Sequence, residues 1–401
     1  MRIDLYTLPL HINYGGILQC YALQTVLQRM GHEVVVLNRR GPKERLSLWL
    51  FLLRCVSVIK CIIRRYLLGQ KQWAIVKPWA FNYTPILQND YQRPLPTYLV
   101  PFAQKHICLT KPLHGKEAFL RYVSTHPCDA FVVGSDQVWR GAYNADVTES
   151  FCSFLPDTDP RRRIVYAASF GTEYVDISPE KLPECRRLAQ FFSAVSVREQ
   201  SAIRLAKEAL GIEPQWVLDP TMLLTADDYR SLWQHEESQW EGITTYVLDA
   251  SEEKSQIQHD VSQTLSLPVN ALMLPPIDQD GKPVDMIPVE VWLKAFAQAS
   301  FVITDSFHGC VFSIIHRKPF IAIANRERGI DRFTSLLGYF GLMDRLIFSL
   351  EEYQQKRSSL LTPIDYVPIV QKHEEARTSS LTFLREAIEH LSSGSLFSTT
   401  E

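Results

Sequence analysis

One stretch of the sequence decides the fold class: Phe301-Val-Ile-Thr-Asp-Ser-Phe-His-Gly-Cys-Val-Phe-Ser-Ile-Ile-His-Arg-Lys-Pro-Phe-Ile-Ala-Ile-Ala324. Its two ends, 301–304 and 320–324, are short apolar runs rich in Ile, which is typical of strands buried on both faces. Between them, apolar residues recur at helical spacing up to Ile315, and Pro319 marks where that helix ends. A strand, a helix and a second strand within so few residues indicate a crossover unit of a parallel sheet.

The turn Asp305-Ser306-Phe307-His308-Gly309, between the first strand and the helix, is the strongest clue to chemistry. It follows the carboxyl end of a strand and opens a helix, where free backbone N–H groups and the helix dipole favour an anion. His308 places a titratable imidazole in that first turn. In the structural alternative, Asp305 or Ser306 only caps the helix and His308 serves packing.

Length, composition and charge limit the classes of protein that fit. The chain has 401 residues, of which 46% are hydrophobic and 21% charged, so we expect a globular protein of two domains. A formal net charge of −2 argues against a general nucleic-acid binder. Eight scattered cysteines lack metal-ligand spacing, which indicates buried thiols in a reducing cytoplasm and neither disulfides nor a metal site. Arg2 and Asp4 interrupt the first apolar segment, so we expect no secretory signal and a cytoplasmic location.

Residues 46–68 resemble a membrane segment at first sight, because they are strongly apolar. Four basic residues within the segment argue against a span: Arg54, Lys60, Arg64 and Arg65. A basic amphipathic helix could instead lie on an anionic membrane surface, which would bring the protein to the inner face of the membrane. The alternative, which we favour, is a helix that packs its apolar side on the protein.

The chain begins with a strand at 2–7, a loop at 11–16, a helix that ends at Gly31, and a strand at 33–37. This unit places a ligand at the carboxyl edge of a sheet. The loop is not Gly-x-Gly-x-x-Gly, and no Lys-Ser/Thr follows it, so neither a dinucleotide site nor a P-loop is indicated. Gly15-Gly16 either forms a tight turn or lets a substrate approach the backbone closely.

Four further strands of the first half each end in polar residues beside a turn. They are predicted at 129–133, 163–168, 194–197 and 216–218, and are followed by Gly134 to Trp139, Ser169 to Gly171, Arg198-Glu199, and Asp219 to Thr221. In a doubly wound sheet such ends gather along one edge. Any one of them could be a helix cap, but together with the His308 turn they favour a ligand site.

A polar segment at 226–242 marks the predicted domain boundary. Strand–helix alternation resumes after it, with strands at 246–249 and 269–272 and a helix at 289–299. We therefore expect a Rossmann-like domain at 1–225, a second at 240–365, and a C-terminal helix with a frayed tail at 366–401 that packs back on the first domain. Two such domains would face each other across a cleft that closes on substrates and excludes water.

Six motifs, in this order and at these separations, resemble the polysaccharide pyruvyl transferase family from about residue 2 to residue 345. They are Asn13-Tyr14-Gly15-Gly16-Ile17-Leu18-Gln19, Gly134-Ser135-Asp136-Gln137-Val138-Trp139, Ala168-Ser169-Phe170-Gly171, Val197-Arg198-Glu199, Leu218-Asp219-Pro220-Thr221 and Thr304-Asp305-Ser306-Phe307-His308-Gly309. The resemblance implies two facing Rossmann-like domains, similar to GT-B glycosyltransferases. It also implies transfer of a pyruvate unit from phosphoenolpyruvate to two hydroxyls of a sugar, in a polysaccharide or its lipid-linked precursor, with a ketal formed and phosphate released.

The same resemblance places the family's donor-binding histidine at His308 and its donor-binding arginine at Arg198. Some members carry an arginine two positions before the histidine, where this chain has Ser306. The missing cation would have to come from Arg328 or Arg332, although a solvated charge run is the alternative for those residues. The expected donor site comprises Arg198, Ser306, His308, Gly309 and Arg328, and no cofactor or metal is expected beside the donor.

Ketal formation requires a general acid for the methylene carbon and a general base for the hydroxyls. The candidates are His308, Asp136 and Asp219, and the sequence leaves the two roles open between the carboxylates. The expected acceptor side comprises Asn13, Tyr14, Gly15, Gly16, Ser135 and Ser169. Trp139 either stacks on a sugar or packs in the core. A nucleotide-sugar glycosyltransferase and a non-catalytic sugar-binding protein are the alternatives, since a fold does not fix a function.

Overall fold

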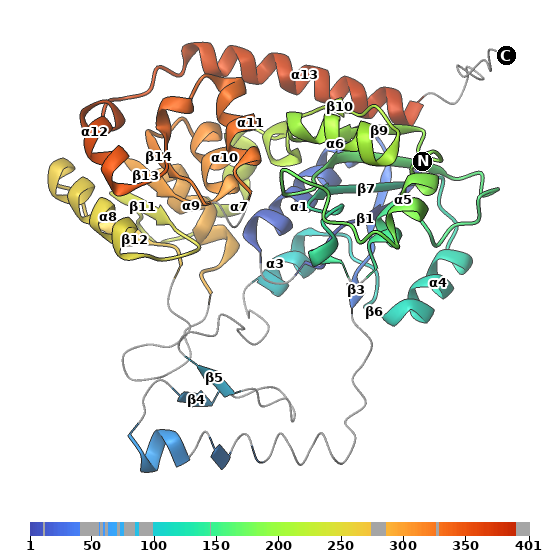
Figure 1. Ribbon diagram of the computed structural model, residues 1–401, viewed down its shortest axis with the longest axis horizontal. Coiled ribbons are helices and arrows are strands. Elements are labelled where there is room, and N and C mark those ends of the chain that lie inside the picture. Colours follow the sequence, from blue (N-terminus) through green and yellow to red (C-terminus); the bar gives the residue numbers. More distant parts are fainter. Residues whose placement is uncertain are drawn as a thin grey trace.

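The computed structural model describes residues 1–10, 13–40, 99–144, 146–273, 286–325 and 329–389, together with positions 56, 59–60, 63–69, 73–75 and 85–87. These residues form two larger parallel β-sheets, each flanked by helices (Figure 1). The long helix α13 (Val367–Glu389) runs across both halves of the molecule (Figure 1). The predicted α/β class with two Rossmann-like parallel-sheet units is confirmed.

The sheet of the first half has the strand order β10-β9-β8-β7-β1-β2, and its neighbouring strands pair in parallel. Its strands are β1 (Arg2–Tyr6), β2 (Glu33–Val36), β7 (Ala130–Asp136), β8 (Arg162–Ala168), β9 (Ala194–Val197) and β10 (Gln215–Trp216). The strand order changes direction between β1 and β7, and ligands usually bind beyond the carboxyl ends of such a strand pair. Helix α1 (Tyr14–Arg29) begins there and ends before Gly31, whose φ of +88° is the expected left-handed conformation.

The sheet of the second half has the order β12-β11-β13-β14-β15, again with parallel neighbours. Its strands are β11 (Ile243–Tyr246), β12 (Val269–Ala271), β13 (Phe301–Thr304), β14 (Phe320–Ile323) and β15 (Leu346–Ile347). Helix α10 (Phe307–Ile315) connects β13 to β14 as the predicted crossover. Here the order changes direction between β11 and β13, so the His308 turn leaves the sheet at the corresponding position.

The remaining elements cover the sheets or connect them. The helices are α3 (Leu99–His106), α4 (Gly115–Thr125), α5 (Leu182–Ala189), α6 (Gln200–Leu210), α7 (Ala226–Trp233), α8 (Glu252–Leu265), α9 (Val289–Gln298), α11 (Asp331–Phe340) and α12 (Leu350–Leu360). The short π-helical segment is η1 (Ile63–Leu67), and the short 3-10 helices are η2 (Gly141–Tyr143), η3 (Val147–Phe151), η4 (Pro220–Leu223) and η6 (Met343–Arg345). Two small strand pairs complete the list, β3 (Arg39–Arg40) with β6 (Leu113–His114), and β4 (Trp73–Ile75) with β5 (Pro85–Leu87).

Two predicted element positions were wrong. The strand predicted at 129–133 continues to Asp136, because Gly134 and Asp136 pair with β8 where we expected a turn. The strand predicted at 246–249 lies at 243–246. The polar segment at 226–242 contains helix α7, which Thr225 and Asp228 begin with a reciprocal capping box, so its polarity reflects the capping residues and one exposed face of a helix that buries Tyr229.

Aromatic residues join the two halves through a shared core. Tyr14 at the start of α1 stacks on Trp292 of α9 with ring centroids 5.5 Å apart, and its hydroxyl donates to Ile287 O at 2.5 Å. Tyr229 of α7 meets Phe312 of α10 with centroids 5.0 Å apart. Buried aromatic pairs of this kind stabilise the junction through dispersion and through the apolar surface that they bury. The junction is therefore packed at these positions.

Helix α13 attaches the second half to the first. Ser380 Oγ accepts a hydrogen bond from Leu218 N at 3.0 Å, and Arg377 Nε donates to Leu223 O at 2.8 Å. Near the start of α13, Lys372 O accepts from the Tyr339 hydroxyl at 3.3 Å. One helix thus bonds to elements of both halves.

Three other expectations have structural outcomes. Trp139 is fully buried and stacks on Phe151 with centroids 5.5 Å apart, so it packs in the core. Five of the six described cysteines are buried, whereas Cys108 is exposed.

Apolar side chains described in the 46–68 segment are exposed, contrary to the packing that we favoured: Val56, Ile59, Ile63, Leu67 and Leu68. No helix among the described residues combines the length and apolar character needed to cross a membrane, and membrane-surface contact stays a prediction.

Asp4, in the middle of β1, places a carboxylate inside the sheet of the first half, where burial should make its charge unfavourable. Its side chain is fully buried, with Arg2 Nε 3.9 Å from Oδ1. Burial raises the pKa of Asp4 to about 6. Since the folded-state pKa lies above the unfolded value, ionisation of this group lowers the stability as the pH rises from about 4 to about 6.

We expect Asp4→Asn to raise the free energy of unfolding at pH 7.5 by about 2 kcal/mol. The gain should shrink towards zero below pH ~4, where both proteins carry an uncharged side chain. Urea unfolding across this pH range measures the difference. Asp344→Asn, at a largely exposed carboxylate, serves as control, and an equal gain in both variants at every pH would contradict the prediction.

Candidate functional site

The carboxyl ends of the two sheets, where ligands of such folds usually bind, come together at Gly15 and His308. Gly15 lies in the first turn of α1, and His308 lies in the first turn of α10. A β-carbon at position 15 would overlap His308 Nδ1, so the imidazole packs directly on the Gly15 backbone. Glycine is required here because the ring occupies the volume that any side chain would need.

Asp219 connects His308 to the first sheet. It follows β10 and caps η4, and its Oδ1 accepts from Thr221 N at 3.0 Å and Thr221 Oγ1 at 2.6 Å. Its Oδ2 accepts from Arg198 Nη1 at 2.9 Å and lies 3.7 Å from His308 Nε2. Arg198 and His308, which come from different halves, therefore converge on one carboxylate.

Arg198 is surrounded by carboxylates. Besides Asp219, its Nη2 donates to Asp136 Oδ1 at 2.8 Å, and its Nε lies 3.7 Å from Glu199 Oε1. Asp136 ends β7 with a φ of +68°, a conformation that is uncommon for a residue other than glycine. Ser169 Oγ donates to Glu199 Oε1, which fixes the third carboxylate of the cluster to the residue that follows β8.

Arg332 brings a second guanidinium to the same region. The Cζ atoms of Arg198 and Arg332 lie 4.8 Å and 5.8 Å from the centroid of the Phe307 ring. Gly329 (φ +84°) packs on Gly171 so closely that a β-carbon there would overlap Gly171 O. This backbone contact holds the start of α11, and with it Arg332, against the first half.

Burial and charge set the protonation of the cluster. Burial opposes the charge of Asp219, but attraction from His308 at 3.7 Å, the charge of Arg198 and the hydrogen bond from Thr221 Oγ1 outweigh it and hold the pKa of Asp219 well below its usual range. Burial also opposes the charge of Arg198, whose carboxylate neighbours nevertheless raise its pKa. Burial raises the pKa of Glu199. Burial and the nearby Arg198 charge lower the pKa of Arg332 to about 10, so both arginines stay charged at neutral pH.

The turn around His308 is built from residues with structural partners. Ser306 occupies the N-cap position of α10 without a side-chain cap, which leaves the capping alternative for its hydroxyl unsupported. Asp305 bonds to the neighbouring loop, where it accepts from Leu248 N at 2.6 Å and Lys254 Nζ at 2.7 Å. A β-carbon at Gly309 would overlap Thr304 Oγ1, so this glycine lets α10 pack on β13. Arg328 lies outside the described residues.

The predicted acceptor residues divide into two groups. Asn13 is exposed and begins α1 with no side-chain cap, whereas Gly15 and Gly16 follow it in the first turn and are buried. The three residues that carry hydroxyls are buried as well: Tyr14 packs in the aromatic junction, Ser169 bonds to Glu199, and Ser135 Oγ donates to Gln19 Oε1 at 2.6 Å. These three hydroxyls could meet a sugar only after their present contacts rearrange.

Sequence reasoning gave no role to Phe307 and Glu199, although both lie within the quoted motifs, and left Arg332 as a second choice after Arg328. The sequence carried only weak signals for them: Phe307 adjoins His308, Glu199 adjoins Arg198, and Arg332 lies in a run of three arginines. Within the described residues, no three His, Cys, Asp or Glu side chains are grouped closely enough to hold a metal ion. The site is thus a buried arrangement of two guanidiniums, three carboxylates and one imidazole.

Several solved structures are similar to this chain. Spinosyn rhamnosyltransferase SpnG has a TM-score of 0.43 and 11% identity, covering 96% of this chain and 99% of that chain. A putative UDP-N-acetylglucosamine 2-epimerase from Listeria monocytogenes has a TM-score of 0.49 and 10% identity, covering 99% and 98%. The E. coli heptosyltransferase WaaC with ADP has a TM-score of 0.39 and 8% identity, covering 95% and 100%. No curated protein matches the sequence.

A family described as "Polysaccharide pyruvyl transferase" matches residues 13–327. This stretch is well over half of the chain, and it begins at the first turn of α1 and includes the His308 turn. The chain belongs to the polysaccharide pyruvyl transferase family.

Proposed function

We propose that the protein transfers the enolpyruvyl unit of phosphoenolpyruvate to two hydroxyls of a sugar, in a polysaccharide or its lipid-linked precursor, with a pyruvate ketal formed and phosphate released. The observation that carries the proposal is the position of His308, 3.7 Å from Asp219 of the first half and packed on Gly15. Family membership supports a transferase of this class. The donor, the acceptor and the roles of the residues are our proposal.

The donor carries a carboxylate and a phosphate, so its site needs positive charge and oriented N–H groups. Arg198 is already held by Asp136 and Asp219, so in this arrangement it contributes mainly long-range attraction and positions the two carboxylates. We assign direct contact with the donor to His308 and to the backbone N–H groups in the first turn of α10, from Phe307 to Gly309, because the Ser306 N–H already donates to Thr304 Oγ1 at 3.0 Å. Arg332, a buried cation beside Arg198, supplies the charge that Ser306 lacks.

The proposed reaction begins with protonation of the methylene carbon by His308, which forms a C–H bond and leaves a cationic centre at carbon 2. A sugar hydroxyl attacks this carbon and gives its proton to a base. A second hydroxyl then replaces phosphate at the same carbon, and its proton leaves with the base or the phosphate. Asp219, held ionised beside His308, stabilises the imidazolium, so the base role falls to Asp136.

The exposed edge at Asn13 is the proposed entrance for the acceptor. Asn13 is exposed and can offer hydrogen bonds to a sugar without rearrangement, whereas Gly15 and Gly16 are buried behind it. Ser135 and Ser169 act in this proposal as supports, since they hold Gln19 of α1 and Glu199 in place. An acceptor bound at this edge would reach the donor beside His308.

Product analysis distinguishes this reaction from that of a nucleotide-sugar glycosyltransferase. We expect phosphate release from phosphoenolpyruvate that depends on a saccharide acceptor, together with an acceptor product that carries the mass increment of a pyruvate ketal. A saccharide panel with mass detection makes the measurement. Release of a nucleoside diphosphate from a sugar nucleotide, without phosphate release from phosphoenolpyruvate, would overturn the proposal. Thermal stabilisation by phosphoenolpyruvate without turnover on any acceptor would point to a binding protein.

His308→Ala should lower acceptor-dependent phosphate release on the order of a hundredfold or more, because it removes the proposed acid. The folded state should persist, because Asp219 keeps its hydrogen bonds from Arg198 and Thr221 when the imidazole is removed. His259→Ala, at an exposed histidine of α8 in the same half, controls for the loss of an imidazole. Near-normal turnover of His308→Ala would refute the assignment of the acid.

Gly15→Ala tests the contact between the halves without touching a titratable group. The added β-carbon must displace the His308 ring, so we expect a loss of activity of about tenfold or more. Gly16→Ala is the matched comparison, because the nearest atom to a β-carbon there is Asn13 Cβ at 3.4 Å. It should lose less activity than Gly15→Ala. Equal effects of the two substitutions on steady-state rates would show that the His308 contact does not matter.

A further inference from the structure

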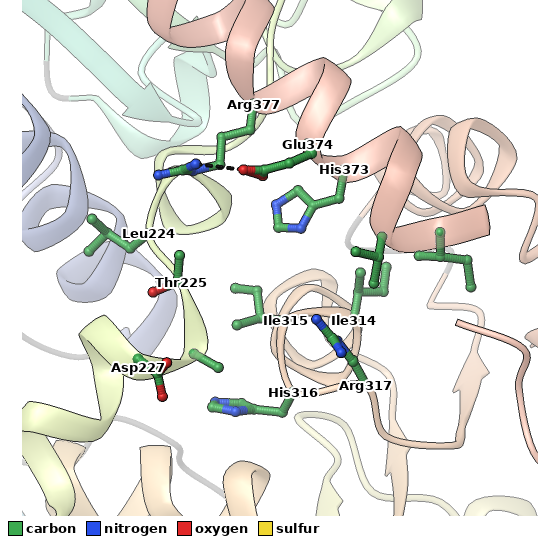
Figure 2. A pocket seen from close by; sticks show the side chains of 13 residues that line it. Leu224, Thr225, Asp227, Ile314, Ile315, His316, Arg317, His373, Glu374 and Arg377 are labelled. Atoms are coloured by element: carbon green, nitrogen blue, oxygen red, sulfur yellow. Dashed lines mark hydrogen bonds and ion pairs between the residues drawn. The ribbon is translucent and has the colours of Figure 1, made fainter. Parts of the chain in front are cut away.

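A cavity of about 480 Å³ lies at the end of α10 that is opposite to His308 (Figure 2). Three parts of the chain form its walls: residues 224–227 between the two halves, residues 314–317 at the end of α10, and residues 369–377 of α13. The cavity therefore lies where residues 224–227, which we call the linker, meet the second half and helix α13. None of its lining residues belongs to the candidate functional site described above.

The lining divides into an apolar part and a polar rim. Apolar side chains come from all three walls: Leu224, Ala226, Ile314, Ile315, Ile369 and Val370. The rim carries two arginines, two carboxylates and two histidines. Figure 2 shows His316 and Arg317 at the end of α10, with Arg377 and Glu374 side by side on α13. Such a lining suits a small molecule with an apolar body and a polar head.

His316 contributes a polar atom that has no partner. Its Nε2 is buried and forms no hydrogen bond with any described residue. Burial lowers the pKa of His316 to about 3, so the ring is neutral at physiological pH. A neutral imidazole can donate or accept one hydrogen bond at this nitrogen, depending on its tautomer. Because buried polar atoms are normally paired, this nitrogen is an unfilled hydrogen-bonding position in the cavity wall, which a ligand reaches when the ring turns toward the cavity.

Arg317 contributes a charge that nothing in the described chain compensates. It is exposed, and no ion pair joins it to a described residue. The acidic groups nearby have other partners: Glu374 pairs with Arg377 Nη1 at 2.9 Å, and Asp227 lies in the first turn of α7, where the helix dipole favours an anion. Arg317 also holds a φ of +53° after the end of α10, where glycine is usual.

We propose that this cavity binds a small amphipathic anion, and that its occupancy is coupled to the candidate functional site through α10. The apolar part would rest on the isoleucines, the carboxylate or phosphate would pair with Arg317, and a polar atom would bond to His316 once its ring turns toward the ligand. Helix α10 carries His308 at one end and Arg317 beyond the other, about 14 Å away. A ligand that touches the linker, α10 and α13 together favours the arrangement in which these parts are close, and this is the condition for coupling.

Calorimetric titration with hexanoate and with hexyl phosphate tests the binding site and distinguishes the two head groups. Hexylammonium and hexanol are the controls: both carry the same six-carbon chain, but the first is a cation and the second is uncharged. We expect saturable binding of at least one anion and at least tenfold weaker binding of both controls. Equal binding of hexanol or hexylammonium, or no binding of either anion, would overturn the proposal.

Arg317→Gly separates a binding role from a structural one. It removes the charge and suits the positive φ, so the variant should be as stable as the wild type or melt about 1–2 °C higher. Ser266→Gly relieves the same kind of conformation, φ +53°, after α8 and away from the cavity. The anion should bind at least tenfold more weakly to Arg317→Gly and normally to Ser266→Gly. Unchanged binding to Arg317→Gly would overturn the proposal.

Backbone hydrogen exchange tests the coupling and needs no turnover, so its outcome is independent of the proposed reaction. Saturation with the anion that binds should slow exchange at 313–318 and 369–377, and also at 305–310 around His308. The slowing at all three segments should disappear in Arg317→Gly. Exchange at 305–310 that does not respond to a bound anion would overturn the coupling.

Discussion

The buried guanidinium of Arg198 is the interaction on which the first half of the molecule depends. Arg198 follows β9, Asp136 ends β7 and Asp219 follows β10, so one side chain bonds the carboxyl ends of three strands. Burying charge is costly, and a pair of this kind is held only when its partners are complete. Removing one partner would leave an uncompensated buried charge, which typically costs about 3–5 kcal/mol. The geometry of the site is therefore also a condition for the fold around it.

This arrangement changes how positive charge is available to an anionic donor. A guanidinium with two carboxylates on its Nη atoms is poorly placed to grip a further anion. The second half contributes the complementary parts, namely His308, the uncapped start of α10, and Arg332 beside the Phe307 ring. The first half thus supplies ordered carboxylates and the second half supplies donors, and Gly15 lets them approach. The chemistry that we propose requires both halves in this relative position.

Helix α10 links the two ends of the junction between the halves. Its first turn carries His308 against Gly15, its middle packs Phe312 against Tyr229, and its end lines the cavity with Ile314 and Ile315. All nine of its residues are buried, so it cannot shift without displacing its neighbours. Any change in the packing of α13 or the linker at one end must therefore be accommodated at the other. This is the physical basis for connecting the cavity to the site.

The sequence by itself determined the alternation of strands and helices, the crossover at 301–324, and the convergence of polar strand ends on one edge. These features follow from local periodicity and from turn residues, which act within a few positions. Only the tertiary structure decided that Gly15 faces His308, that Trp139 and Tyr14 point into cores, and that Arg332 reaches the Phe307 ring. Such contacts join residues far apart in the chain, and the direction of each side chain is set by packing that no local pattern records.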